Sequence, residues 1–146
     1  VQSELFAHFL YSQIANELQR LGYFGAEKYF RNESNDEFLH YGILTGYYND
    51  MGDCAKIPSL PPVAPIINNI GDAINLAYKT ELDLMRQYED FYSSVEEDDP
   101  VTAQFLLSFL AIQKNSVGEF GDLISRYEKN PTDVFELDEY ISDLVK

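Results

Sequence analysis

Helix-breaking residues divide this chain into five segments, and this division constrains the fold more than any other feature of the sequence. In chain order, the breakers are Gly22 and Gly25, Gly52 to Pro65, Asp98 to Pro100, and Asn130 with Pro131. The segments between them cover residues 1–21, 24–51, 67–97, 100–129 and 132–145. Each of the first four is too long for a strand, and apolar residues recur every three or four positions, as on one helix face. The sequence therefore predicts an all-α fold with four long helices and a short fifth helix.

The lengths of the connections predict how these helices are joined. The breaks at residues 22–25 and 97–100 allow only tight turns, so each joins two antiparallel helices. The proline-rich connection between the second and third helices has roughly 15 residues, which reach about 50 Å when extended, whereas a helix of about 28 residues is about 42 Å long. We therefore expect residues 1–146 to form one domain, a four-helix bundle with a long crossover between helices 2 and 3 and a short C-terminal fifth helix.

Charge and cysteine content exclude several classes of function. Ten Lys and Arg residues against 25 Asp and Glu residues give a formal net charge of −15. This charge disfavours nucleic acid and anionic membranes as partners, because both would be repelled. No segment reaches the run of about 20 apolar residues that spans a bilayer. The single cysteine, Cys54, cannot form an internal disulfide and is given no role. We expect a cytoplasmic protein.

The apolar stripe of each long helix is interrupted by a few polar residues. In chain order they are Glu4 and Tyr11, then Glu33, Glu37 and His40, then Glu81, and finally Gln113 and Ser116. Counted along antiparallel helices, Glu4, Glu37, His40, Glu81 and Gln113 all fall at one height, about 20 to 24 Å from the same end of the bundle. The sequence therefore predicts a polar layer inside an apolar interior.

Such a layer needs a cation. Carboxylates that meet in an apolar interior cost several kcal/mol each unless they are compensated, and neither Lys nor Arg lies on these stripes. Three carboxylates and an imidazole suit iron or manganese, with zinc as a competitor. Glu37 and His40 form an E-x-x-H pair on one helix face. His8, four residues after Glu4, falls off the stripe and is expected to be exposed, and Glu33 is interpreted as a flanking residue.

At these positions the chain resembles ferritin, and the similarity covers essentially its whole length. Residues 4–12, E-L-F-A-H-F-L-Y-S, look like the ferritin stretch that holds the first iron-binding glutamate and a tyrosine seven residues later, here Glu4 and Tyr11. Residues 33–40, E-S-N-D-E-F-L-H, are similar to the segment whose glutamate bridges two irons and whose histidine binds one. These are Glu37 and His40.

Two further helices and the C-terminal segment extend the resemblance. Glu81, in A-Y-K-T-E-L-D-L, falls where the family has its second-iron glutamate, and Gln113 matches the glutamine beside that iron. Residues 134–144 resemble the short fifth helix of prokaryotic ferritins. Bacterioferritin fits less well, because its second E-x-x-H is absent from the fourth helix, where Gln113 stands. No haem is expected.

The resemblance implies an iron-storage protein with ferroxidase activity. In the family, 24 identical subunits form a shell, and a di-iron centre in each subunit oxidises Fe(II) with O2 or H2O2 before Fe(III) is stored as a mineral. Glu4, Glu37 and His40 would hold one iron, and Glu37 with Glu81 would hold the other. Tyr11 would be a nearby electron donor.

Some positions differ from the family pattern. Ser116 and Ile112 stand where bacterial ferritins often carry acids, which argues against a third iron site. Ala103 and Leu106 replace the acids of eukaryotic threefold channels, so we expect another route for iron entry. Three alternatives stay open: a catalytically weak shell subunit, a non-cage di-iron oxidase acting on an organic substrate, and, least favoured, a metal-free helical adaptor.

Overall fold

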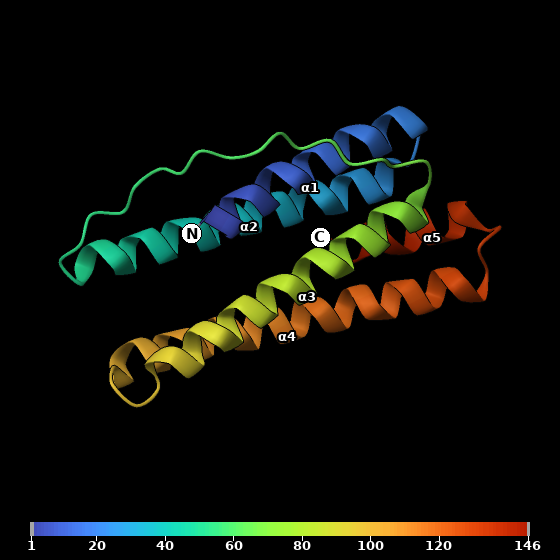
Figure 1. The fold of residues 1–146 in the computed structure, drawn as a ribbon. Helices are drawn as coiled ribbons and strands as arrows, with labels where there is room; N and C mark the ends of the chain where they lie inside the picture. Colours follow the sequence, from blue (N-terminus) through green and yellow to red (C-terminus); the bar gives the residue numbers. More distant parts are fainter. Residues whose placement is uncertain (1, 146) are drawn as a thin grey trace. The chain divides into compact units, whose positions relative to one another are not determined.

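A computed structural model of the chain describes residues 2–145 and contains five α-helices in this part of the chain (Figure 1). In chain order they are α1 (Gln2–Leu21), α2 (Phe24–Asp50), α3 (Ile70–Val95), α4 (Pro100–Lys129) and α5 (Val134–Asp143). The predicted segments are confirmed, with ends that differ by at most three residues. None of the described helices is long and apolar enough to cross a membrane.

The breakers act as their chemistry predicts. Gly22 has φ +88° and Gly52 has φ +95°, a left-handed backbone conformation that suits glycine, and each lies just beyond the end of a helix. Pro100 begins α4, where its missing N–H costs no intrahelical hydrogen bond. The helix ends are therefore set by local backbone chemistry.

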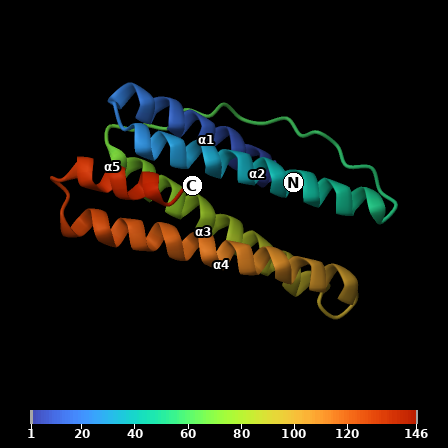
Figure 2. The same cartoon turned by 180° about the vertical axis from the view of Figure 1, so that it is seen from behind.

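The chain divides into two compact units, and the first contains residues 2–73 and 132–145. In it α1 and α2 form an antiparallel hairpin, and the link between α2 and α3 runs back along this hairpin (Figures 1 and 2). Hydrogen bonds join the link to both helices of the hairpin: Gln2 Nε2 donates to the Ser59 carbonyl oxygen at 3.1 Å, and the Ala55 N–H donates to Asn49 Oδ1 at 2.8 Å. The long crossover predicted from the prolines is thus observed as an extended connection.

Hydrogen bonds join helix α5 to the beginning of α2. Tyr23, the N-cap residue of α2, makes no side-chain capping hydrogen bond. Asp138 of α5 supplies the missing acceptors, since its carboxylate accepts the backbone N–H of Gly25 at 3.1 Å and that of Ala26 at 2.7 Å. Gly25 permits this approach, because a Cβ there would lie 2.3 Å from the Asp138 carbonyl oxygen.

The second unit contains residues 74–131, in which the greater part of α3 and all of α4 form another antiparallel hairpin. Asp99 caps α4: its carboxylate accepts the Thr102 hydroxyl at 2.5 Å and the Thr102 backbone N–H at 3.1 Å. These two hydrogen bonds lower the pKa of Asp99 below its ordinary value of 3.8. The acidic run before Pro100 thus ends in a helix cap.

Aromatic rings also pack between the two helices of this hairpin. Tyr88 of α3 stacks on Phe109 of α4 with ring centroids 5.4 Å apart.

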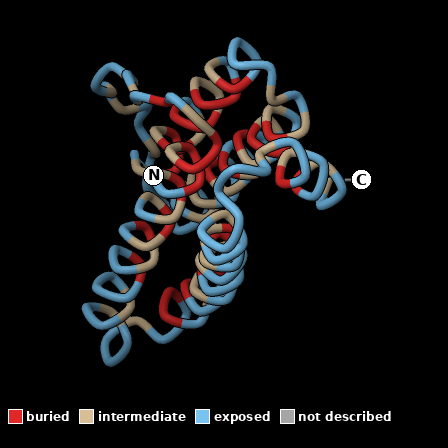
Figure 3. The backbone as a smooth tube through the Cα atoms, turned by 90° about the vertical axis from the view of Figure 1, so that its right-hand side faces the viewer, coloured by how far each residue is buried: buried red, intermediate tan, exposed pale blue. Residues whose placement is uncertain are grey.

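Buried residues recur turn by turn along the long helices (Figure 3). Most apolar residues that recur at the three- and four-residue spacing of the predicted stripes are buried, including Ile14, Phe30 and Phe120. Two apolar residues that continue the same spacing to the helix ends are exposed instead: Leu21 is 42% exposed and Met51 is 53% exposed. Fewer neighbouring side chains cover the last turn of a helix than its middle, so the apolar spacing overestimates burial there.

Candidate metal centre

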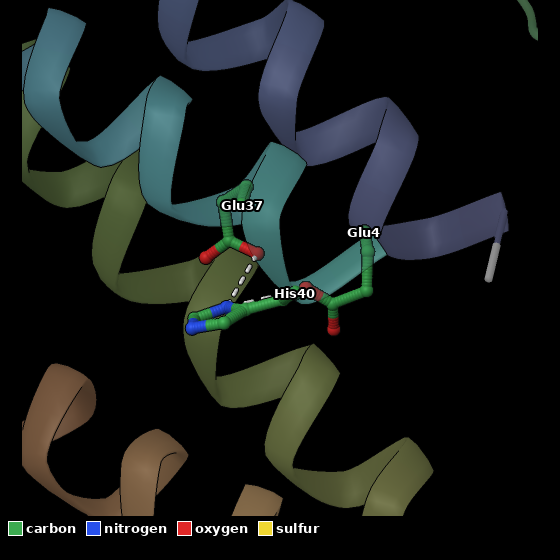
Figure 4. Close-up of side chains that lie close together, drawn as sticks. All are labelled: Glu4, Glu37 and His40. Carbon is green, nitrogen blue, oxygen red and sulfur yellow. Dashed lines mark ion pairs between the residues drawn. The ribbon is translucent and has the colours of Figure 1, made fainter. Parts of the chain in front are cut away.

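Three metal-ligating side chains meet inside the first unit. Glu4 comes from the first turn of α1, and Glu37 and His40 come from one face of α2 (Figure 4). One ligand atom from each lies within 4.8 Å of the others, and in the described part of the chain this is the one group of at least three His, Cys, Asp or Glu residues with that property. The predicted grouping of these three residues is confirmed.

The distances suit a shared cation. His40 Nδ1 lies 3.5 Å from Glu37 Oε2 and 3.7 Å from Glu4 Oε2. Two atoms each about 2.1 Å from one ion are about 3.0 Å apart at a right angle and about 3.4 Å apart at a tetrahedral angle. The two separations from His40 Nδ1 are slightly wider than these values, and all three ligand atoms lie within 4.8 Å of one another.

The burial of these side chains favours a bound cation. The side chains of Glu4 and Glu37 are 1% and 3% exposed, and that of His40 is 16% exposed. Two carboxylates lose hydration and repel each other in such a setting, and a divalent ion offsets both effects. Oxygen ligands with one imidazole are a donor set typical of iron, manganese and zinc. The group can therefore bind a transition metal.

The second unit contains the other predicted pair. Gln113 Nε2 donates to Glu81 Oε2 at 2.7 Å and to the Glu81 carbonyl oxygen at 3.3 Å, and both residues are fully buried. Because a carbonyl oxygen only accepts, the amide nitrogen of Gln113 must face Glu81. Gln113 Oε1 accepts no hydrogen bond from the described residues. The hydrogen bonds confirm that Glu81 and Gln113 lie at the same height, as predicted. The Glu81 carboxylate and the Gln113 amide oxygen are the potential metal ligands of this pair.

The remaining sequence candidates lie outside the three-residue group. Tyr11 is fully buried on α1, with its ring edge-on to Phe30 at 5.8 Å between centroids. Glu33 is partly buried on α2, one turn before Glu37, and does not belong to the group. Cys54 is an exposed thiol in the link between α2 and α3. The electron-transfer role of Tyr11 stays a prediction.

One expectation about this region is wrong. His8 was predicted to be exposed because it falls off the apolar stripe, but it is half-buried and its Nδ1 lies 2.8 Å from the Ser34 carbonyl oxygen. The positions of His8 and Ser34 along their helices could have indicated this contact. His8 follows Glu4 by one turn and Ser34 precedes Glu37 by one turn, so two polar side chains lie beside the candidate ligands on facing helices.

Comparison with known proteins shows which family and which solved structures the chain resembles. The model of the ferritin family, described as a ferritin-like domain, matches residues 1–130. No curated protein matches the sequence. An open-pore ferritin from the hyperthermophilic archaeon Archaeoglobus fulgidus has a TM-score of 0.92 and 18% identity, over 97% of this chain and 88% of that one.

Two engineered proteins are also similar in structure. A humanized archaeal ferritin has a TM-score of 0.92 and 16% identity, over 97% of this chain and 88% of that one. A closed form of the Archaeoglobus fulgidus ferritin made by site-directed mutagenesis has a TM-score of 0.90 and 17% identity, with the same coverage. These likenesses confirm the predicted fold class, an all-α ferritin-like four-helix bundle with a short C-terminal helix. With a family model that matches residues 1–130, the chain belongs to the ferritin family.

Proposed function

We propose that this protein oxidises Fe(II) at an intrasubunit di-iron centre and stores Fe(III) as a mineral inside a cage of identical subunits. The observation that carries the proposal is the buried group of Glu4, Glu37 and His40, whose ligand atoms lie within 4.8 Å of one another. Membership of the ferritin family supports iron as the metal. Iron is here both substrate and cargo.

We assign the residues as the family resemblance implies. Glu4, Glu37 and His40 bind one iron, and Glu37 with Glu81 binds the other, with Gln113 beside it. This assignment treats the two units as one functional domain over residues 1–146. The hydrogen bond from Gln113 to Glu81 supports it, because the amide orients the carboxylate and leaves Gln113 Oε1 as a neutral oxygen ligand.

The chemistry follows from charge. Carboxylate ligands stabilise Fe(III) more than Fe(II), because their attraction grows with the charge of the ion. Each Fe(II) gives up one electron, and O2 or H2O2 accepts the electrons from both irons. Tyr11, two helical turns from Glu4 and fully buried, is the proposed nearby electron donor. No haem is required.

We also propose assembly into a homo-oligomer of 24 subunits. Three large apolar side chains of α2 support an interface there: Phe38 is 51% exposed, Leu39 63% and Ile43 52%. Burial of these side chains against other subunits would remove them from water. The exposed thiol of Cys54 fits the reducing environment of the cytoplasm.

A catalytically weak shell subunit is the second candidate. The observation that favours it is the small number of charged ligands in the second unit, where Glu81 is paired with a neutral amide. A second iron held by few charged groups would bind weakly and turn over slowly. Oxidation that depends on Glu81 would exclude this candidate.

Anaerobic addition of Fe(II) followed by air tests the proposal. Ferric absorbance and particle mass are recorded for the native chain, for Glu37→Gln, and for the matched control Asp36→Asn, which removes a neighbouring negative charge from the same helix. We expect rapid oxidation in the native chain and in Asp36→Asn, loss of it in Glu37→Gln, and an iron-filled particle about 24 times the 16.8 kDa chain. Equal oxidation by all three proteins would overturn the proposal.

A further inference from the structure

His8 and Ser34 form a reciprocal pair of hydrogen-bonding groups between α1 and α2. His8 Nδ1 lies 2.8 Å from the Ser34 carbonyl oxygen and 2.9 Å from Ser34 Oγ, and Ser34 Oγ donates to the His8 carbonyl oxygen at 2.7 Å. Each residue thus contacts the backbone of the facing helix as well as the partner's side chain. We call this pair the His8–Ser34 latch.

Donor and acceptor counting fixes the proton positions in the latch. The Ser34 carbonyl oxygen can only accept, so His8 Nδ1 carries a hydrogen and donates. Ser34 uses its own hydroxyl hydrogen for the His8 carbonyl, so Ser34 Oγ accepts from the same Nδ1–H. Both hydrogens that join the two residues therefore have an acceptor when His8 carries a hydrogen on Nδ1.

Two neighbouring aromatic rings flank the partly buried latch. The His8 ring lies 4.9 Å from the Phe9 ring and 5.0 Å from the Phe38 ring, measured between centroids. Ser34 is only 4% exposed. Hydrogen bonds shielded from water are electrostatically stronger than exposed ones, and leaving one partner unsatisfied there is costly. The latch is thus suited to hold the two helices at one relative position.

That position matters for the metal ligands. Along α1, His8 is one turn from Glu4, about 6 Å of axial rise, and along α2, Ser34 is one turn from Glu37, about 4.5 Å. A slide or rotation of α1 against α2 would break the latch and change the separation of Glu4 from Glu37. Ligand groups need placement within about 0.5 Å to bind well.

We propose that His8 and Ser34 are positioning residues that hold Glu4 at the distance from Glu37 and His40 needed to share one cation. They do not ligate the ion themselves. The proposal rests on the function proposed above, because it concerns the same cation site. It predicts that metal affinity depends on two side chains that bind no metal.

Anaerobic titration with Co(II), followed by calorimetry and by visible absorption, tests the latch. The disrupting variants are Ser34→Ala and His8→Leu. His8→Asn is the conservative variant, because the amide nitrogen of asparagine occupies about the place of histidine Nδ1. Asn16→Ala is the matched control: it removes the hydrogen bond from Arg31 to Asn16, 3.2 Å long, which also joins α1 and α2. Thermal unfolding is measured for every variant.

We expect Ser34→Ala and His8→Leu each to weaken Co(II) binding about three- to tenfold and to alter the absorption of the bound ion. Because both break the same latch, the double variant should bind little worse than either single variant. His8→Asn should restore most of the affinity, and Asn16→Ala should leave it unchanged. A general loss of stability would not give this pattern.

The outcomes separate the two proposals. Native affinity in both disrupting variants, or equal weakening in Asn16→Ala, would overturn the positioning role while leaving the cation site intact. Absence of Co(II) binding by the native chain would overturn the proposed site itself, and the role of the latch with it. Additive losses in the double variant would also count against a shared latch.

Discussion

The α1–α2 hairpin and the α3–α4 hairpin bury different sets of polar side chains. In the first, two carboxylates and an imidazole bring their ligand atoms within 4.8 Å of one another. In the second, Glu81 is already engaged by the amide of Gln113 at 2.7 Å. A cluster of charged acceptors attracts a cation, whereas a carboxylate with a hydrogen-bond donor is already partly satisfied. We therefore expect the first hairpin to bind its ion more tightly.

The hairpins also differ in how a carboxylate caps a helix. Asp99 caps α4 from the adjoining residue and accepts from Thr102, three residues away. Asp138 caps α2 from another helix and accepts from Ala26, 112 residues away in the chain. One cap forms with its helix, while the other requires α5 to be in place. The first unit thus depends more on long-range order.

Substitution of Glu81 by glutamine tests the chemical difference and has the largest expected effect. If Glu81 is the second-iron ligand proposed above, this variant should slow Fe(II) oxidation by at least about 100-fold, the upper end of the loss caused by groups that only support ligands. The first equivalent of Co(II) should still bind within about twofold of native affinity, because Glu4, Glu37 and His40 are all unchanged in this variant. Stopped-flow absorbance and calorimetry measure the two quantities. Oxidation at the native rate would show that the second hairpin is dispensable.

Substitution of Gly25 by alanine tests the dependence on α5. The new Cβ would lie 2.3 Å from the Asp138 carbonyl oxygen and 2.8 Å from Ser142 Cβ, so α5 must move. We expect a loss of about 1–3 kcal/mol in the free energy of unfolding, measured by urea denaturation. Gly42→Ala is the control in the same helix, where the Cβ meets no atom within 4 Å. It should raise stability slightly through helix propensity, and equal losses in both variants would contradict this account.

Removal of the long-range cap should have a smaller effect. Asp138→Ala leaves the N–H groups of Gly25 and Ala26 without their side-chain acceptor, and Tyr23 provides no replacement. We expect a loss of about 1 kcal/mol and faster hydrogen exchange at the start of α2. Exchange that accelerates throughout the chain instead would mean that α5 does more than cap this helix.

Removal of the local cap should have the smallest effect, and it depends on pH. The pKa of Asp99 is lowered from 3.8 because its ionised form accepts the hydroxyl and N–H of Thr102. Its stabilisation is therefore complete above pH 3.8 and disappears as pH falls through the lowered pKa. The stability gap between native protein and Asp99→Ala should close in this acidic range, as measured by unfolding at successive pH values. A gap that stays constant would contradict the assignment.

Much of the candidate site was predictable because its signals lie within single helices. Glu37 and His40 are three residues apart, so helical geometry alone places them on one face. Glu4 joined them by counting turns from the Gly22–Gly25 break, and the group in the structure confirms that count. His8 was misjudged because burial depends on what the facing helix presents, here Ser34. The roles of Glu81, Gln113 and Tyr11 in iron chemistry stay predictions.

The sequence by itself determined where the helices begin and end and which positions interrupt their apolar stripes. Glycine conformation, the missing proline N–H and helical spacing act over a few residues, so they can be read locally. Only the tertiary structure decided that Asp138 caps α2, that Gly25 must lack a side chain, and that His8 faces Ser34. These contacts join residues far apart in sequence, and they exist only because packing selects which turn of one helix meets which turn of another.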